Sequence, residues 1–261
     1  MFHLILLKWQ PFIFVFALIL LLGWETVTPF FSIRKRVEHG IKNLFLSGLN
    51  TVILLGVFAG LIVADATMVD ARQIGVINWL GVPYPWNGIL AFFALDIWTY
   101  WWHRFNHVVP FLWRFHRMHH SDPEMDVTTA TRFHFGEITF STLIRLLLIP
   151  LIGIPLWALI VYDILLLVST QFHHANIYLP ASFDRALRFV IVTPFMHKVH
   201  HSNIQRETDS NFTSIFSFWD RVFRSYRERE NYREIHFGVE GYSGDEEQTL
   251  PNLILSPLGK R

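Results

Sequence analysis

Three long stretches of the chain contain no Asp, Glu, Lys or Arg. They lie between Lys8 and Glu25, between Lys42 and Asp65, and between Arg72 and Asp96. A helix needs about 20 mostly apolar residues to cross the hydrocarbon core of a bilayer. The first two stretches therefore predict membrane spans over Trp9–Trp24 and Asn43–Ala64. No small-residue cleavage site follows the first, which favours a retained anchor over a signal peptide. The third stretch contains a Gly- and Pro-rich turn, so its predicted span is restricted to Gly88–Trp102.

A further apolar block runs from Ile138 to Phe172, and Pro150, Gly153 and Pro155 interrupt its middle. Proline and glycine at that point end one helix and allow the chain to reverse. The block therefore predicts a helical hairpin that crosses the membrane or enters it from one side. Together these segments predict an all-α integral membrane protein with four to five transmembrane or re-entrant helices.

Basic residues indicate the orientation. The loop after the first predicted span contains Arg34, Lys35, Arg36 and Lys42. The positive-inside rule places this loop in the cytoplasm, and successive spans then return residues 103–120 and everything after His174 to the same side. The segment Ala175–Arg261 holds 11 Lys/Arg and 11 Asp/Glu, about half of all charges in the chain. We expect it to form a polar cytosolic cap on the membrane.

Composition supports the membrane assignment and removes several other classes. Hydrophobic residues make up 52% of the 261 residues and charged residues only 16%, whereas soluble domains carry about 25% charge. A net charge of +1 gives no indication of nucleic acid as a partner. The chain has no cysteine, which excludes disulfides, thiolate nucleophiles, iron–sulfur clusters and cysteine-type zinc sites.

The 14 histidines are concentrated in four short motifs. These are HRFNH (residues 103–107), HRMHH (116–120), QFHH (171–174) and HKVHH (197–201). The i, i+3 and i+4 spacings put the imidazoles on one face of a helix. Two rings at i and i+4 can bind one metal ion, and a third at i+3 can hold a neighbouring ion. A pH-sensing histidine cluster, the simpler alternative, does not require this repeated spacing. The pattern therefore predicts metal binding.

Counting ligands suggests two ions. The three spaced motifs supply eight histidines, and His174 makes nine, which exceeds what one ion uses. Imidazole suits iron, zinc, copper and nickel, but a structural zinc needs only four ligands. So many neutral ligands suggest redox iron with positions left open for oxygen. Carboxylates should offset the charge and orient the rings. Asp96, seven residues before His103, is the best candidate, and Asp163 stands in a similar relation to His174.

The motifs resemble those of the fatty acid hydroxylase superfamily, which includes sterol desaturases, C4-methylsterol oxidases and alkylglycerol monooxygenases. The segments that carry the resemblance are HRFNH, HRMHH, TATRFHFGE, QFHHAN, TPFMHKVHHS and DSNFTSIFSFWDRVF, between Leu90 and Tyr226. The resemblance implies a membrane di-iron oxygenase whose cytosolic helical cap holds the metals. It also implies three regions: membrane anchor helices at 1–87, a catalytic domain at 88–226 and a cytosolic tail at 227–261.

Carried over position by position, the resemblance implies nine metal ligands: His103, His107, His116, His119, His120, His174, His197, His200 and His201. Some relatives carry a tenth histidine where this chain has Thr170, and Gln171, His173 or water could replace it. His134 matches a histidine that either hydrogen-bonds a ligand or binds metal itself. Asn176 and Asp220 are interpreted as structural hydrogen-bonding residues. Four tryptophans flank the HRFNH and HRMHH motifs and are candidates for a wall of the substrate site: Trp98, Trp101, Trp102 and Trp113.

The implied activity is hydroxylation or desaturation of an unactivated C–H bond in a lipid, such as a sterol, fatty acyl, sphingoid or ether lipid. It would use two iron ions, O2 and a separate electron donor, a ferredoxin or a cytochrome b5-type carrier with its reductase. The absence of cysteine favours a bacterial inner membrane over the endoplasmic reticulum. The alternative is a non-catalytic metal-binding membrane protein, either a transporter or a zinc-stabilised scaffold. A transporter should hold its histidines inside the membrane, whereas these histidine motifs lie just beyond the predicted spans. A bis-histidine haem protein would not need two HxxHH motifs.

Overall fold

The computed structural model describes residues 2–259, whose regular elements are all helices, with no extended strand among them. Four segments of this part are long and apolar enough to cross a membrane: Ile5–Val27, Arg36–Trp79, Phe135–Ile152 and Leu156–His174. The expected all-α membrane class with four to five such helices is therefore confirmed.

The four segments correspond to the long helices of the chain. The first lies in α1 (Phe2–Val27). The second comprises α2 (Arg36–Ile53), a π-helical turn η1 (Leu54–Phe58), α3 (Ala59–Arg72) and the short α4 (Val76–Trp79). The predicted hairpin is formed by α7 (Phe135–Ile152) and α8 (Leu156–His174). The remaining expected span, Gly88–Trp102, lies within α5 (Trp86–Val108), which is helical but not among the four.

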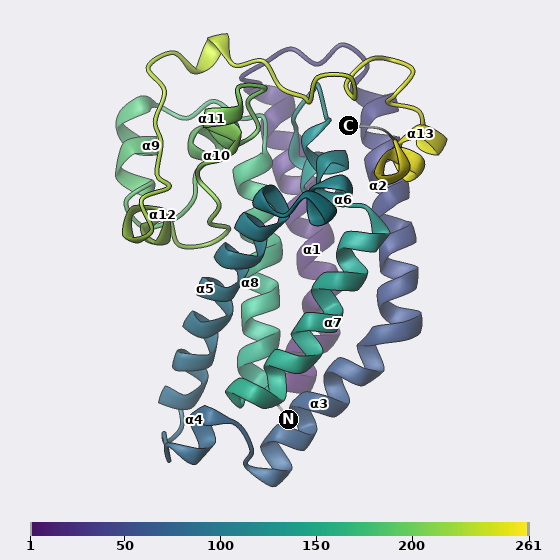
Figure 1. Cartoon of the computed structure of the whole chain (residues 1–261). Helices are drawn as coiled ribbons and strands as arrows, with labels where there is room; N and C mark the ends of the chain where they lie inside the picture. Colours follow the sequence, from purple (N-terminus) through teal and green to yellow (C-terminus); the bar gives the residue numbers. More distant parts are fainter. Residues whose placement is uncertain (1, 260–261) are drawn as a thin grey trace.

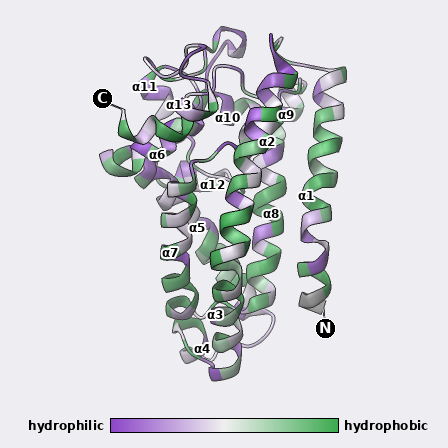
Figure 2. Cartoon of the chain, turned by 90° about the vertical axis from the view of Figure 1, so that its right-hand side faces the viewer, coloured by the Kyte–Doolittle hydropathy of each residue, from purple (hydrophilic) through white to green (hydrophobic). Residues whose placement is uncertain are grey.

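The long helices form an elongated bundle with a cap at one end (Figure 1). The start of α1, the α3–α4 turn and the α7–α8 turn lie at the opposite end (Figure 1). Figure 2 shows mostly hydrophobic residues along the bundle and a larger share of hydrophilic ones in the cap. The bundle is held by a buried apolar cluster to which α3, α5, α7 and α8 contribute, through residues such as Val69, Leu95, Ile149 and Leu159.

Glycine and proline set the distal turn of the hairpin. Gly153 ends α7 in the left-handed region at φ +86°, and Pro155 occupies the position before α8. Gly75, at φ +95°, ends the α3–α4 turn directly against Gly153, where a Cβ on Gly75 would clash with backbone. Only glycine combines these positive φ angles with so close an approach. The reversal predicted at residues 150–155 is thus confirmed, and it packs against a second turn.

The cap is built from short helices joined by loops. They are α6 (Pro110–His120), η2 (Val127–Thr131), α9 (Ala181–Leu187), α10 (Pro194–His200), α11 (Gln205–Thr208), α12 (Phe218–Val222), η3 (Tyr232–Glu234), α13 (Leu250–Leu255) and η4 (Ser256–Leu258). A small apolar cluster of Leu46, Met118 and Leu253 joins α2, α6 and α13. The expected tail 227–261 supplies η3, α13 and η4, and its last two residues lie outside the described part.

Candidate metal centre

Two groups of histidines meet where the bundle enters the cap. The first contains His103, His107, His116, His120 and His200, and the second contains His119, His174, His197 and His201. Within each group, one ligand atom per residue lies within 4.8 Å of all the others. The nine residues are those singled out from the sequence, and they come from α5, α6, α8 and the α10 region.

The helical spacing distributes each HxxHH motif between the two groups. In α6, His116 and His120 are one turn apart and belong to the five-histidine group, whereas His119 belongs to the four-histidine group. In the α10 motif the assignment is reversed, because His197 and His201 belong to the four-histidine group and His200 to the other. The i, i+4 pairs therefore stay together, and the i+3 ring reaches the neighbouring group.

The distances between ring nitrogens fit metal ligation. His200 Nε2 lies 3.0 Å from His103 Nε2, and His174 Nε2 lies 3.2 Å from His119 Nε2 and 3.1 Å from His197 Nε2. Two nitrogens bound at about 2.1 Å to one ion, at right angles, would be about 3 Å apart. Among the described residues, the buried His116 Nε2 and His201 Nε2 have no hydrogen-bond partner. The donor set therefore fits two closely spaced ions bound by imidazole.

Backbone carbonyls orient several of the rings. The Nδ1–H groups of His103, His174 and His200 donate to Phe212 O, Thr170 O and Ser210 O, each at 2.7 Å. A carbonyl only accepts, so Nδ1 carries the proton in each ring and Nε2 keeps its lone pair. That lone pair is the one directed toward the other histidines. These bonds fix the tautomer that a metal requires.

Carboxylates complete the surroundings of the five-histidine group, but not the ones expected. Glu137 of α7 accepts from His116 Nδ1 at 2.9 Å, and Asp209 Oδ1 lies 3.5 Å from His107 Nδ1. Asp96, the predicted residue, instead accepts from Trp219 Nε1 at 2.8 Å. Its helical register matches His103, but the indole of Trp219, which lies in α12, packs against it. No spacing in the sequence pointed to Glu137, although it ends the TATRFHFGE motif.

Burial keeps the cap histidines neutral. Desolvation, followed by the charges of neighbouring rings, lowers the pKa of His119, His120 and His200 well below the usual 6.5. The same two causes lower the pKa of His197 and His201. Neutral imidazole is the form that binds a metal ion. The environment thus prepares the ligand state before any ion enters.

The other residues that the sequence suggested for the site belong to neither histidine group. His134 is in neither group, because its Nδ1 accepts from Gly136 N to cap α7 and its Nε2 donates to Ile254 O at 2.9 Å. Gln171 Nε2 donates to Phe14 O of α1. His173 is buried beside the four-histidine group, with its ring centroid 4.0 Å from that of His197. Thr170 Oγ1 bonds back to its own helix and offers only its carbonyl to His174.

Aromatic rings line both groups. Trp113, one of four predicted wall residues, lies with its ring 5.1 Å from that of His107 and 5.6 Å from that of His120. The other three lie on α5, whereas Trp113 lies on α6; Trp98 stacks on Trp102, and Trp101 packs on Phe223. Two rings that the sequence did not single out also contact the histidine groups. Phe133 stacks on His119 at 4.4 Å, and Phe212 lies 5.2 Å from His107.

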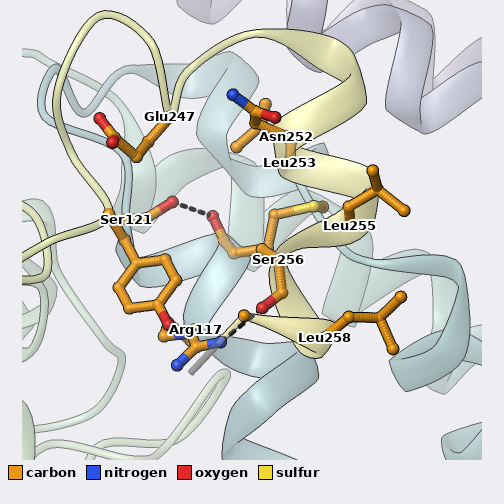
Figure 3. Close-up of a pocket in the computed structure, with 11 residues that line it drawn as sticks. Arg117, Ser121, Glu247, Asn252, Leu253, Leu255, Ser256 and Leu258 are labelled. Carbon is orange, nitrogen blue, oxygen red and sulfur yellow. Dashed lines mark hydrogen bonds between the residues drawn. The ribbon is translucent and has the colours of Figure 1, made fainter. Parts of the chain in front are cut away.

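A surface pocket lies on the opposite side of α6 (Figure 3). It is lined by Arg117, Ser121 and residues of α13 and η4, and has a volume of about 420 Å³. The Arg117 guanidinium stacks on Tyr242 at 3.7 Å and donates to Ser256 O at 2.5 Å. Arg117 and Ser121 point away from the face that carries His116, His119 and His120. The pocket is therefore separate from the histidine groups.

A buried polar network contacts the end of α6, which carries the HRMHH motif. Asp122 lies 2.8 Å from His39 Nε2 and accepts from Thr129 Oγ1 at 2.7 Å. Arg132 donates to Met118 O and Asn43 Oδ1. Burial opposes ionisation of Asp122, but His39 and Arg132 outweigh it and lower its pKa well below the usual range. No sequence pattern pointed to this network, because its members have no shared spacing.

Comparison with known proteins agrees with the geometry. The family model described as "Fatty acid hydroxylase" matches residues 88–225, just over half of the chain. The chain is 30% identical over 143 residues to alkylglycerol monooxygenase of Xenopus tropicalis, covering 54% of this chain and 31% of the relative. The human alkylglycerol monooxygenase is 28% identical over 153 residues, covering 58% of this chain and 33% of the relative.

A bacterial relative belongs to the same set. Ornithine lipid hydroxylase OlsE of Rhizobium tropici is 24% identical over 159 residues, covering 61% of this chain and 47% of the relative. The match spans about a third of the alkylglycerol monooxygenases and about half of OlsE. No solved structure gives a significant match. From the family match and the histidine motifs within it, the chain belongs to the fatty acid hydroxylase family.

Proposed function

We propose that this protein is a membrane-bound di-iron, O2-dependent oxidoreductase that hydroxylates an unactivated C–H bond of a lipid. The observation that carries the proposal is the pair of adjacent buried groups of five and four histidines. Nine imidazoles exceed the needs of a single structural ion. The named lipid monooxygenase and hydroxylase relatives support oxidation rather than metal storage or transport.

The residues of each group would hold one ion. When bound, the two irons would supply the activation of O2 and the removal of a hydrogen atom from the lipid. Imidazole ligands are compatible with iron, and the Nδ1–carbonyl bonds hold His103, His174 and His200 in the ligating tautomer. Glu137 would offset part of the positive charge through His116. Phe133, Phe212 and Trp113 would exclude water.

The substrate would be a lipid that reaches the site from the bilayer. The histidine groups lie at the cap ends of α5 and α8, so an apolar chain would approach them along the bundle. The relatives are named for an alkylglycerol and for an ornithine lipid, both lipids with a polar head. We therefore favour a polar-headed lipid over a sterol, and hydroxylation over desaturation. A separate ferredoxin or cytochrome b5-type donor would supply electrons from the cytoplasmic side, where the basic loop after α1 would place the cap under the positive-inside rule.

Metal analysis with a matched pair of variants tests the proposal. The purified protein should contain two irons that are magnetically coupled in its Mössbauer spectrum. His119→Ala should lower the iron content and abolish lipid oxidation, because it removes a member of the four-histidine group. His236→Ala should change neither, because His236 is exposed and belongs to neither group. One zinc per chain, or metal binding unaffected by His119→Ala, would favour a non-catalytic scaffold.

Labelled oxygen tests the reaction itself. Membranes that contain the protein and a reducing system would be supplied with a panel of lipids under ¹⁸O2. A hydroxylated product should carry an ¹⁸O atom, whereas a desaturated product would carry none. Mass spectrometry of the extracted lipids distinguishes the two and identifies the lipid class. Iron-loaded protein that oxidises none of the lipids, with the donor shown to reduce it, would contradict the proposed function.

A further inference from the structure

Several large apolar side chains outside the four spans are exposed on one part of the cap. Phe183 in α9 is 52% exposed, Phe189 and Val190 after it are 66% and 57% exposed, and Val222 of α12 is 61% exposed. We call these four residues the α9–α12 patch. They lie in the charged segment Ala175–Arg261, for which the sequence predicts a polar cap. In water their exposure would be unfavourable.

Backbone pairing fixes the depth of this patch. Val192 N donates to Ile215 O, and Ser217 N donates to Val190 O, so the chain after α9 runs beside the chain before α12. The ring of Phe216 lies 5.5 Å from that of Phe93 and 6.1 Å from that of Phe92, both in α5. The end of the α9 segment therefore lies at the level of the first half of α5.

That level is well below the metal centre. Phe92 packs on Tyr162 of α8 at 5.2 Å. Tyr162 precedes His174 by 12 residues, which is about 18 Å along a helix. Ile215 also belongs to the apolar cluster that joins α3, α5, α7 and α8. In Figure 1, α12 lies beside α5, lower than α10 and α11. The segment is thus alongside the spans rather than above them.

Polar atoms of this segment are turned inward. Trp219 Nε1 donates to Asp96 of α5, and the Asp220 carboxylate accepts from the backbone N–H groups of Phe212 and Thr213. Ser217 Oγ donates to Arg188 O. Backbone next to lipid is tolerated when the protein itself satisfies its polar groups. The outward side is left to Phe189, Val190 and Val222.

Arginines border the apolar residues. Arg221 lies over the rings of Phe189 and Tyr226, at 5.4 and 4.0 Å, and Arg185 and Arg224 are exposed. Two nearby acids are engaged with Arg188, since Asp184 pairs with it and Glu228 lies 3.5 Å from it. Aromatic and apolar residues next to arginines are typical of the lipid headgroup region, where long basic side chains reach the phosphates.

We propose that the α9–α12 patch inserts into the leaflet on the cap side, with Phe189, Val190 and Val222 among the acyl chains and Arg185 and Arg224 at the phosphates. The cap would then be fixed to the bilayer by a non-spanning element in addition to the spans. The patch would continue the lipid-facing surface of the bundle at the level of Phe92 and Phe93, against which Phe216 packs. The proposal is independent of metal loading and of the reaction.

Nitroxide labelling tests the depth directly. The chain has no cysteine, so single variants Phe189→Cys and Val222→Cys can be labelled specifically in the full-length protein. Each would be reconstituted into bilayers of phosphatidylcholine and phosphatidylglycerol. Power saturation then compares accessibility to oxygen, which concentrates in lipid, with accessibility to a water-soluble nickel chelate.

Three further variants calibrate this comparison. Leu147→Cys on α7, where Leu147 is 67% exposed, is the lipid reference. Ile204→Cys, before α11, is the matched apolar control on the cap, and Asp245→Cys is the water reference.

The ratio of oxygen to nickel accessibility should exceed one at positions 189 and 222, as at 147, and should be below one at 204 and 245. Two patch positions guard against one variant that misfolds. A ratio below one at both would overturn the proposal. So would low accessibility to both reagents together with dipolar broadening, because this would place a second copy of the chain on the patch.

Discussion

Glu137 Oε1 lies 2.9 Å from His116 Nδ1, and both side chains are buried. The same oxygen accepts from Asn106 Nδ2 at 3.3 Å. A helix of the hairpin thus supplies a carboxylate to a histidine group built by α5, α6 and α10. The bond holds the proton on Nδ1 and leaves Nε2 of His116 free to ligate.

Removing this charge should weaken metal binding without removing a ligand. We expect Glu137→Gln to lower the metal affinity of the five-histidine group by about 10- to 100-fold. The amide keeps the size of the side chain, so the fold should be retained. Iron content measured after dialysis against graded chelator gives the affinity. Glu230→Gln, at an exposed position, is the matched control. Wild-type iron retention in Glu137→Gln would show that the contact does not tune the ligand.

The buried network around Arg132 holds α6 in place without contributing a ligand, which can be tested separately. The Arg132 guanidinium donates to Met118 O, Ser121 Oγ and Gln248 Oε1, and thereby connects the end of α6 to the C-terminal segment. Replacing one partner of a buried charged network costs about 3–5 kcal/mol. Arg132→Met should therefore lower the midpoint of thermal unfolding in detergent and loosen the metal. Exposed Arg206→Met should do neither. An unchanged midpoint in Arg132→Met would contradict a structural role for the network.

The sequence predicted the features that depend on the order of residues within a single helix. Uncharged stretches located α1 and the α2–α3 segment, and an apolar block interrupted by proline and glycine located the α7–α8 hairpin, because membrane spans require long apolar runs. The i, i+3 and i+4 spacing singled out eight of the nine histidines that the fold collects into two groups, and His174 of the QFHH motif is the ninth. Both patterns are properties of single helices, and a single helix can be read without its neighbours.

Contacts between distant segments could not be predicted in this way. Asp96 has the register of a partner for His103, but which group it meets depends on the position of Trp219, 123 residues later. Glu137 meets His116 only because α7 packs on α6, and Asp209 meets His107 across the cap. His134 has the chemistry of a ligand, but Gly136 N and Ile254 O occupy its two nitrogens. Such pairings need tertiary structure.

Acid should destabilise the metal-free protein. Burial and neighbouring rings hold the pKa of His119, His120 and His200 well below 6.5 in the fold. As the pH falls below about 6.5, the unfolded chain takes up protons that the folded chain does not, so unfolding becomes more favourable. Each such histidine contributes a loss of up to about 1.4 kcal/mol per pH unit. Above about pH 7.5 this dependence should vanish.

Thermal unfolding of chelator-treated protein between about pH 8 and about pH 5 measures this dependence. His119→Gln should flatten the slope, since it removes one of the shifted groups, whereas His236→Gln should leave it unchanged. Metal-loaded protein should have a higher midpoint at each pH but begin to decline at the same pH, because the rings are neutral in the fold with or without ions and the protons are taken up by the unfolded chain. A midpoint that rises as the pH falls from about 7 to about 5 would show that the buried rings are protonated in the fold.

His134 separates a structural histidine from a ligand. Its Nε2 donates to Ile254 O of α13, and its Nδ1 caps α7. We expect His134→Ala to keep the full iron content while it lowers stability by about 1–2 kcal/mol, because a helix cap and a bond to the C-terminal segment are lost. Limited proteolysis should then cut more readily near residues 242–250. His134→Gln should restore part of the stability through its amide. Loss of iron from His134→Ala, with the fold intact by circular dichroism, would make His134 a ligand after all and require the cap to rearrange around it.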